Sequence, residues 1–328
     1  MKEGTRPSAA RKEKEEARGT TPPPKFFELL PSNTNIDFVG LAPRMLILSA
    51  LFIGISLAAI YFRGGLNYGI DFTGGTVVQV RFPVATPIAD LRGALDASDL
   101  HGVVVQEVGR EGREFQIRAQ GTTDEETAAA AEKTRAVLRE KFGEGAYDVL
   151  SVETVGPKVG RDLWRNATLA VLMSTVMMGL YIAIRFDLRF GVGAATALIH
   201  DVLVAVGALA LTGMEFDLTT VAALLTIVGF SVNDNVVISD RIRENMHKVR
   251  RADLASTLNT AINETLSRTV INSGTVIFVA LSLYLLGGSV IHSFAFTLLV
   301  GFVIGTYSSI FVSTPMVLLM GERGARRK

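Results

Sequence analysis

Six long apolar runs divide the chain, and charged or glycine-rich stretches separate them. Each run approaches or exceeds the roughly 20 apolar residues that a helix needs to cross a bilayer. The pattern therefore predicts an α-helical polytopic membrane protein. We place its six transmembrane helices at residues 43–62, 163–184, 190–211, 217–239, 269–286 and 294–320. The last five form a helical bundle over residues 163–320, with a charged loop at 240–267.

Between the first two runs the pattern changes to that of a soluble α+β domain. The predicted elements are a strand at 76–82, a helix from Pro87, strands at 103–108 and 115–119, a helix from Thr122 and a strand at 147–155. Thr123 and Glu126 have the spacing of a capping box at the start of the second helix. The order strand, helix, strand, strand, helix, strand is typical of a ferredoxin-like domain, which we place at residues 63–160.

The composition agrees with a membrane protein, since 48% of the residues are hydrophobic and the mean hydropathy is +0.34. The absence of cysteine excludes disulfides, thiolate chemistry and cysteine metal sites. Four scattered histidines do not form a zinc pattern. No catalytic constellation is visible, so we expect neither an enzyme nor a metal or cofactor.

Lysine and arginine gather in alternate connections of the chain. They are frequent in residues 1–35, in the turn at 185–189, in the loop after Ser239 and in residues 321–328. The positive-inside rule then places both termini in the cytoplasm and the ferredoxin-like domain outside. Residues 1–35 are expected to be a disordered charged tail, or alternatively a contact for lipid or ribosome. The first apolar run is expected to be an uncleaved anchor.

A carboxylate interrupts the fourth apolar run, where Asp234 stands between Asn233 and Asn235. A charged group in hydrocarbon costs roughly 3 kcal/mol or more, and such residues commonly mark an ion or proton path. We therefore interpret Asp234 as a titrating site, about five residues or roughly 8 Å of helix before the end of the run. The alternative is an Asp that caps the helix or snorkels to the membrane surface.

Two neighbouring polar residues, His200 and Asp201, lie at the middle of the third run. Adjacent residues on a helix are separated by about 100° of rotation. We therefore expect the two side chains to have different partners. His200 and Asp201 either form structural hydrogen bonds that fix helix packing or belong to a proton relay.

Arg268 begins the fifth run, close to Asn272 and Ser273. It either snorkels to the membrane surface or pairs with Asp234 across two antiparallel helices, where protonation of Asp234 would release it. The amphipathic residues 252–269 are expected to lie at the membrane surface.

Two motifs resemble signatures of the SecF family, accessory subunits of the bacterial Sec translocon. The first is YGIDFTGG at residues 68–75, and its structural motif residues are Gly69, Asp71, Gly74 and Gly75. The second is GFSVNDNVVISDRIREN at residues 229–245. Comparable motifs occur at 155–160, 200–201 and 267–288, so that the resemblance covers nearly all of residues 36–319.

The resemblance implies a partnership with SecD in a relative of the RND superfamily, located in the bacterial inner (cell) membrane. The implied function is to use the proton motive force to promote preprotein translocation through SecYEG. Further implied partners are membrane lipid, the translocating preprotein and, indirectly, YajC and SecA, with no nucleic acid. The family's proton-coupling residues correspond to Asp234 and Arg268. The supporting polar network corresponds to Asn233, Asn235, His200, Asp201, Asn272 and Ser273.

Other functions stay open at this point. The chain is either a proton-coupled subunit, a structural scaffold of the holotranslocon, or a small RND-type exporter. No nucleotide-binding loop is visible, so an ion gradient of H⁺ or Na⁺ is the energy source that this chain offers. The charged N-terminal extension and Asn272 depart from the family pattern, which leaves the role of the extension and the detail of the polar network open.

Overall fold

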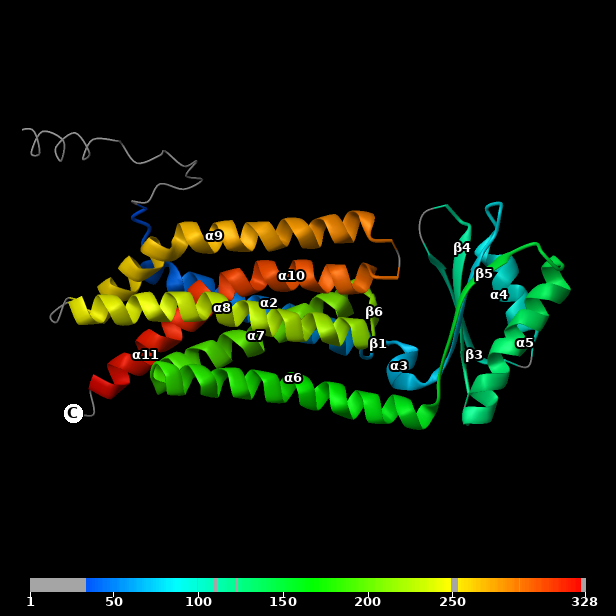
Figure 1. Cartoon of the computed structure of the whole chain (residues 1–328), viewed down its shortest axis with the longest axis horizontal. Helices are drawn as coiled ribbons and strands as arrows, with labels where there is room; N and C mark the ends of the chain where they lie inside the picture. The colour runs from blue at the N-terminus through cyan, green and yellow to red at the C-terminus, as the bar shows by residue number, and fades with distance from the viewer. Residues whose placement is uncertain are drawn as a thin grey trace, which may run out of the picture.

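The computed structural model describes residues 34–98, 100–108, 111–121, 123–248, 253–288 and 290–325. In these ranges a helical bundle and a small α+β domain lie end to end along the long axis of the molecule (Figure 1). The described residues form six helical segments that are long and apolar enough to cross a membrane. The predicted fold class is thereby confirmed. The disordered tail was predicted for residues 1–35, and its residues 1–33 lie outside the described ranges.

The bundle contains five uninterrupted helices and a sixth span built from three consecutive segments. The five helices are α2 (Phe38–Phe62), α6 (Pro157–Arg185), α7 (Leu188–Thr212), α8 (Leu218–Lys248) and α9 (Leu254–Leu286). The sixth span consists of α10 (His292–Ser308), η2 (Ser309–Ser313) and α11 (Thr314–Ala325). Most of these helices extend well beyond the apolar runs, because polar residues at a membrane surface continue a helix as readily as apolar ones.

The first helix begins before Pro43, where the sequence had suggested a start. Asp37 caps α2, and its carboxylate accepts a hydrogen bond of 2.8 Å from the Gly40 amide. The Asn259 side chain of α9 accepts a further hydrogen bond of 2.8 Å from the Phe38 amide. These two acceptors satisfy free amides of the first turn and fix the start of the helix five residues before Pro43, which lies inside it.

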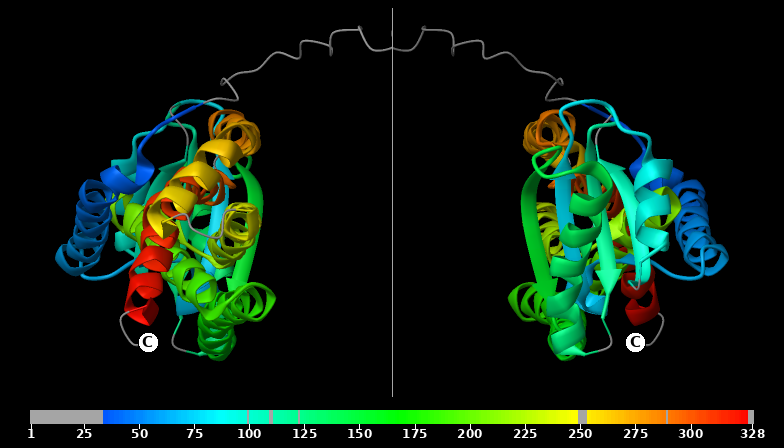
Figure 2. Two further views of the ribbon diagram at one scale, coloured as in Figure 1. Left: turned by 90° about the vertical axis from the view of Figure 1, so that its left-hand side faces the viewer. Right: turned by 90° about the vertical axis from the view of Figure 1, so that its right-hand side faces the viewer.

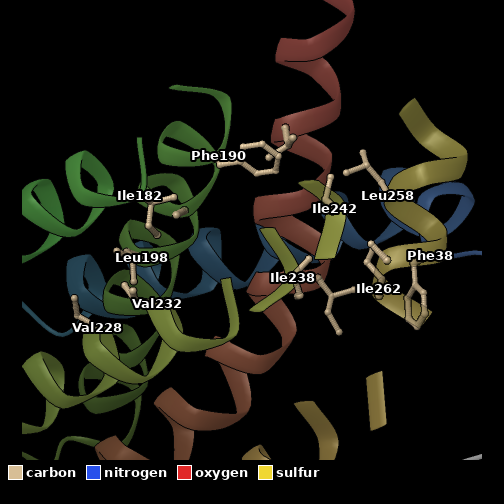
Figure 3. Close-up of a cluster of buried hydrophobic side chains, with 14 residues drawn as sticks. Phe38, Ile182, Phe190, Leu198, Val228, Val232, Ile238, Ile242, Leu258 and Ile262 are labelled. Atoms are coloured by element: carbon tan, nitrogen blue, oxygen red, sulfur yellow. The ribbon is translucent and has the colours of Figure 1, made fainter. Parts of the chain in front are cut away.

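The predicted loop at residues 240–267 is wrong where the structure describes it. Helix α8 continues to Lys248, and α9 begins at Leu254 and runs without interruption to Leu286. The apolar stripe of the amphipathic stretch packs into the bundle. Its buried residues meet side chains of four other helices in one core cluster (Figure 3), which includes Leu258, Ala261, Ile262, Phe38, Phe190, Ile238, Ile242 and Val317.

The α+β domain has the predicted ferredoxin-like order. Its elements are β2 (Gly75–Arg81), α4 (Ile88–Asp96), β3 (His101–Val108), β4 (Glu114–Gln120), α5 (Asp124–Phe142) and β5 (Asp148–Val155). The sheet has the strand order β3-β4-β2-β5, and every neighbouring pair is antiparallel. Thr123 caps α5 as predicted and accepts a hydrogen bond of 3.2 Å from the Glu126 amide.

Both helices of this domain cover the face of the sheet that points away from the bundle (Figure 1, Figure 2). Alternating strand residues and one stripe of each helix bury a common core between them. It includes Val78, Val80, Leu91, Leu95, Phe115, Ile117 and Leu138. The opposite face of the sheet is therefore turned toward the bundle.

Three short elements join the domain to the bundle: β1 (Asn67–Tyr68), α3 (Ile70–Thr73) and β6 (Glu215–Phe216). Strand β1 follows α2, and it pairs in parallel with β6, which precedes α8. The aromatic rings of Tyr68, Phe72, Trp164 and Phe216 pack against one another at this junction. The junction thus brings together segments that are far apart in the sequence.

The last span contains a π-turn that no sequence pattern predicted. It covers Ser309–Ser313, and the Thr314 hydroxyl donates to the Ser309 carbonyl over 3.2 Å. Gly193 of α7 lies directly against this turn, since an added Cβ would be 2.8 Å from the Ser313 carbonyl oxygen. The turn is therefore packed closely against α7.

Candidate functional site

Asp234 lies near the midpoint of α8 and is 2% exposed. It is deeper in its helix than the sequence suggested, because α8 does not end at Ser239. The Ser273 hydroxyl of α9 donates to the Asp234 carboxylate over 3.3 Å, and the Asn272 side chain lies beside the same carboxylate. The carboxylate thus meets the polar side chains of α9 that the sequence had placed in its network.

A third helix contributes a residue that the sequence analysis missed. Thr306 of α10 donates a hydrogen bond of 2.8 Å to the Ser273 hydroxyl. Because Ser273 in turn donates to Asp234, a chain of polar groups connects α8, α9 and α10. A single Thr in an apolar helix is too common to single out, since its hydroxyl usually bonds the backbone of its own helix.

A cavity of about 760 Å³ opens beside Asp234, between α8 and α9. Its lining combines apolar residues with a large share of polar and charged ones, namely Asn233, Asp234, Glu264, Ser267, Arg268, Thr269, Asn272 and Thr275. Asn233, Arg268 and Asn272 are exposed side chains on this lining. The space is therefore suited to water and to charged groups.

The predicted ion pair between Asp234 and Arg268 is not among the ion pairs of the described residues. Both side chains line the same cavity. Arg268 therefore faces the carboxylate across an open polar space and does not hold it. Asn235, in contrast, points into its own helix, where its amide donates to the Ser231 carbonyl over 2.9 Å.

His200 and Asp201 contact each other, contrary to the expectation that neighbours on a helix have separate partners. The His200 Nδ1 lies 3.2 Å from the Asp201 Oδ1, and the Ser231 hydroxyl of α8 donates to the Asp201 Oδ2 over 2.8 Å. Side-chain torsions let the two groups bend toward each other around the helix. The His200 Nε2 is buried and has no partner among the described residues.

Replacing Asp201 with Ala is expected to destabilise the protein by about 1–3 kcal/mol, because Ser231 and His200 would both lose their buried partner. Asp201→Asn keeps an acceptor for Ser231 and is expected to cost less. Thermal unfolding in detergent would measure both variants. Equal stability of Asp201→Ala and the unmodified protein would show that this cluster does not fix α7 against α8.

The glycine-rich motif places its residues at the junction. Gly74 has φ +74° and Gly75 has φ +131°; added Cβ atoms would lie 2.8 Å from the Pro157 Cα and from the Ala119 carbonyl oxygen, respectively. Both a left-handed backbone and close packing therefore require glycine here. Asp71 reaches the bundle, since its Oδ2 accepts a hydrogen bond of 2.9 Å from the Leu218 amide at the start of α8.

Glu215 forms an ion pair with Arg118 of β4, with 2.7 Å between the carboxylate and the guanidinium. Burial raises the pKa of Glu215 above its ordinary value, Arg118 opposes that shift, and the nearby Asp217 and Asp71 add to it. The folded protein thus keeps this proton at pH values where an unfolded chain has lost it. The contribution of Glu215 to folding stability is therefore largest below the ordinary pKa of a glutamate, and it is lost as the pH rises through the raised pKa. The Arg118–Glu215 ion pair is fully charged only above the raised pKa.

These features define a class: a polytopic membrane protein with a buried carboxylate in its helical bundle and a ferredoxin-like domain after the first span. Residues 135–323 match the family model described as protein export membrane protein SecD/SecF, C-terminal, and residues 62–82 match the SecD/SecF GG motif. The chain belongs to the SecF family of protein translocase subunits.

Individual relatives support the same conclusion. The chain is 45% identical to the protein translocase subunit SecF of Magnetococcus marinus, over 90% of this chain and 94% of the relative. It is 38% identical to that of Vibrio alginolyticus, over 90% of this chain and 93% of the relative.

Solved structures of SecDF resemble the fold. The crystal structure of SecDF, a translocon-associated membrane protein from Thermus thermophilus, is similar with a TM-score of 0.80 and 38% identity over 94% of this chain. A crystal structure of SecDF in a super-membrane-facing form has a TM-score of 0.66 and 39% identity over 96% of this chain. The chain spans only 41% and 42% of those longer chains.

Proposed function

We propose that this chain works with SecD as a proton-coupled accessory subunit of the Sec export machinery. In this proposal the pair uses the proton motive force to promote preprotein translocation through SecYEG in the bacterial inner membrane. The observation that carries the proposal is the buried Asp234 carboxylate beside an open polar cavity in the middle of two membrane-spanning helices.

The position of Asp234 favours a functional role over a structural one. A carboxylate deep within a span is costly and persists where it faces protein or water. Asp234 has a hydroxyl partner on one side and the polar cavity on the other. Such a group can take up a proton from water in the cavity and release it again. We infer that protonation changes its interaction with Arg268 and shifts α8 relative to α9.

The position of Arg268 supports a membrane-embedded partner. Arg268 is exposed on α9 where the apolar part of that helix begins, and little of that apolar part is buried within the chain. An arginine that faces lipid inside the hydrocarbon is costly, up to about 2.5–3.5 kcal/mol at the bilayer centre on insertion scales. A polar surface of another membrane protein over the cavity would remove that cost. The solved relatives are named SecDF, and we propose SecD as the protein that covers this cavity.

The orientation follows from the distribution of charge. Lys and Arg are frequent in the turn between α6 and α7 and at the adjoining ends of α8 and α9. We propose that this side and both termini are cytoplasmic and that the ferredoxin-like domain lies outside. There the domain would meet the emerging preprotein, whereas SecA and YajC would be reached only indirectly.

Vesicles that contain SecYEG and the SecD complex test this proposal. An imposed proton gradient is expected to accelerate the completion of preprotein export, since one charge crossing 100 mV supplies about 2.3 kcal/mol. Collapsing the gradient with an ionophore is expected to remove the acceleration. Export that proceeds equally fast with and without the gradient would contradict proton coupling, and a response to a Na⁺ gradient alone would identify the other ion.

A scaffold role is the second candidate, because the hydrogen bond from Ser273 to Asp234 also serves to hold α9 against α8. The scaffold role predicts that substitution of Asp234 weakens assembly of the complex with SecD. The proton-coupled role predicts that this complex still assembles but that export no longer responds to the proton gradient.

A further inference from the structure

Helix α8, which carries Asp234, has no direct covalent connection to the ferredoxin-like domain. The chain enters the domain from α3 and leaves it into α6. Any displacement of α8 must therefore reach the domain through non-covalent contacts. Among the described residues, Arg118–Glu215 is the one ion pair that joins the domain to the bundle side of the junction.

Arg118 fixes two junction strands at once. One terminal nitrogen lies 2.7 Å from the Glu215 carboxylate on β6, and the other donates to the Tyr68 carbonyl on β1 over 3.1 Å. The side chains of Arg118 and Glu215 are only 10% and 20% exposed. Electrostatic attraction is stronger at such a site than in water, and loss of one partner leaves the other charge uncompensated.

Glu215 lies three residues before the start of α8, which two carboxylates hold. Asp217 caps the helix and accepts a hydrogen bond of 2.7 Å from the Thr220 amide, while Asp71 accepts one from the Leu218 amide. Both carboxylates lie at the positive end of the helix dipole, where they are stabilising. Strand β6 therefore continues after one residue into a capped first turn of α8.

Gly69 permits the close approach of these segments. Its amide donates to the Phe216 carbonyl over 2.9 Å, and an added Cβ would lie 2.7 Å from the Glu215 Oε1. A side chain at this position would push the Glu215 carboxylate away from its place beside Arg118.

We propose that the Arg118–Glu215 pair is the joint through which a displacement of α8 moves the ferredoxin-like domain. The inference rests on the proposed function, which requires α8 to shift when Asp234 changes its protonation. Arg118 and Glu215 are positioning residues, since they act through α8 and the sheet. The charged groups that face the Glu215 carboxylate are Arg118 from β4, Asp71 from α3 and Asp217 before α8. A proton on Glu215 would remove its charge and so weaken its attraction to Arg118.

Spin labels can test the joint, because the chain contains no cysteine. Glu140→Cys on α5 and Leu285→Cys at the outer end of α9 introduce one label on each part; Glu140 is exposed and Leu285 is 67% exposed. The distance distribution between the labels would be measured in the SecD complex in vesicles. Asp234→Asn is expected to shift that distribution, and Glu215→Gln is expected to reduce the shift by more than half.

The matched control is the Arg81–Glu114 pair, which joins β2 and β4 of the same sheet at 2.6 Å without touching the bundle. Glu114→Gln is expected to leave the shift unchanged, and exchange of the charges by Arg118→Glu with Glu215→Arg is expected to restore part of it.

A full shift in the Glu215→Gln protein would contradict the proposed role of the Arg118–Glu215 pair. So would an Asp234→Asn protein that loses export without any shift. Unimpaired gradient-driven export by Asp234→Asn would instead reject the proposed function. The role of the Arg118–Glu215 pair would then be decided by whether Glu215→Gln reduces the change in label distance that Asp234→Asn causes.

Discussion

Replacing Asp234 with Asn is expected to reduce the gradient-dependent part of preprotein export at least tenfold while the complex with SecD still assembles. The amide oxygen of Asn can accept the hydrogen bond that Ser273 now donates to Asp234, so packing of α8 against α9 is retained. The amide cannot bind and release a proton at physiological pH. Export driven by an imposed gradient in vesicles would measure the loss, and co-purification of SecD would measure assembly.

Asp240→Asn is the matched control for this substitution. Asp240 is an exposed carboxylate on the same helix, so its loss changes the charge of α8 without affecting the buried network. It is expected to retain nearly full export. If Asp234→Asn exports as well as Asp240→Asn, the buried carboxylate is structural and the scaffold role becomes the better account of the chain.

The second large effect is expected at the contact between α2 and α7. Gly207 of α7 lies so close to Ser56 of α2 that an added Cβ would be 2.1 Å from the Ser56 Cβ. Gly207→Val therefore cannot be accommodated by a side-chain rotation, and the helices must separate. Overpacking typically costs 1–3 kcal/mol, and separation of α2 is expected to cost more than about 3 kcal/mol. Thermal unfolding in detergent would show this loss.

Gly229 of α8 is the control for Gly207, because an added Cβ there meets nothing within 4 Å. Gly229→Ala is expected to leave the melting temperature unchanged or to raise it slightly, since Ala is the better helix former by about 1 kcal/mol. A Gly207→Val protein as stable as Gly229→Ala would mean that α2 is not held against α7 at Ser56.

The architecture could be predicted from the sequence because it depends on long patterns. Six apolar runs determine the number of spans, and alternation between strand and helix periods determines the order of the ferredoxin-like domain. The helix ends were predicted less well. Periodicity reveals that residues 252–269 have an apolar stripe, but it does not reveal what the stripe contacts. In the fold, Leu258 packs into the bundle core and not onto lipid.

The candidate site was predictable in part for a similar reason. A carboxylate in an apolar run is rare, so Asp234 stands out in the sequence. Ser273, its hydrogen-bond partner, was predicted as part of the network because it lies close to Arg268 in the sequence. Thr306 has no such signal, because threonine is ordinary in a membrane helix. The Arg118–Glu215 pair is equally hidden, since both residues are charged in segments where charge is expected and only the fold brings them together.

The π-turn at Ser309–Ser313 places one extra residue in the last span. A π-turn holds one more residue than an α-helical turn over the same rotation. Deleting one residue there is expected to leave an ordinary α-helical turn, so that α10 and α11 keep the faces that they now present. Tyr307, which donates to the Met45 carbonyl of α2, and Val317, which packs beside Gly193 of α7, would then both still face their partners. The same deletion within α10 or α11 would rotate the following residues by about 100°, so this span tolerates a change of length at the π-turn and not elsewhere.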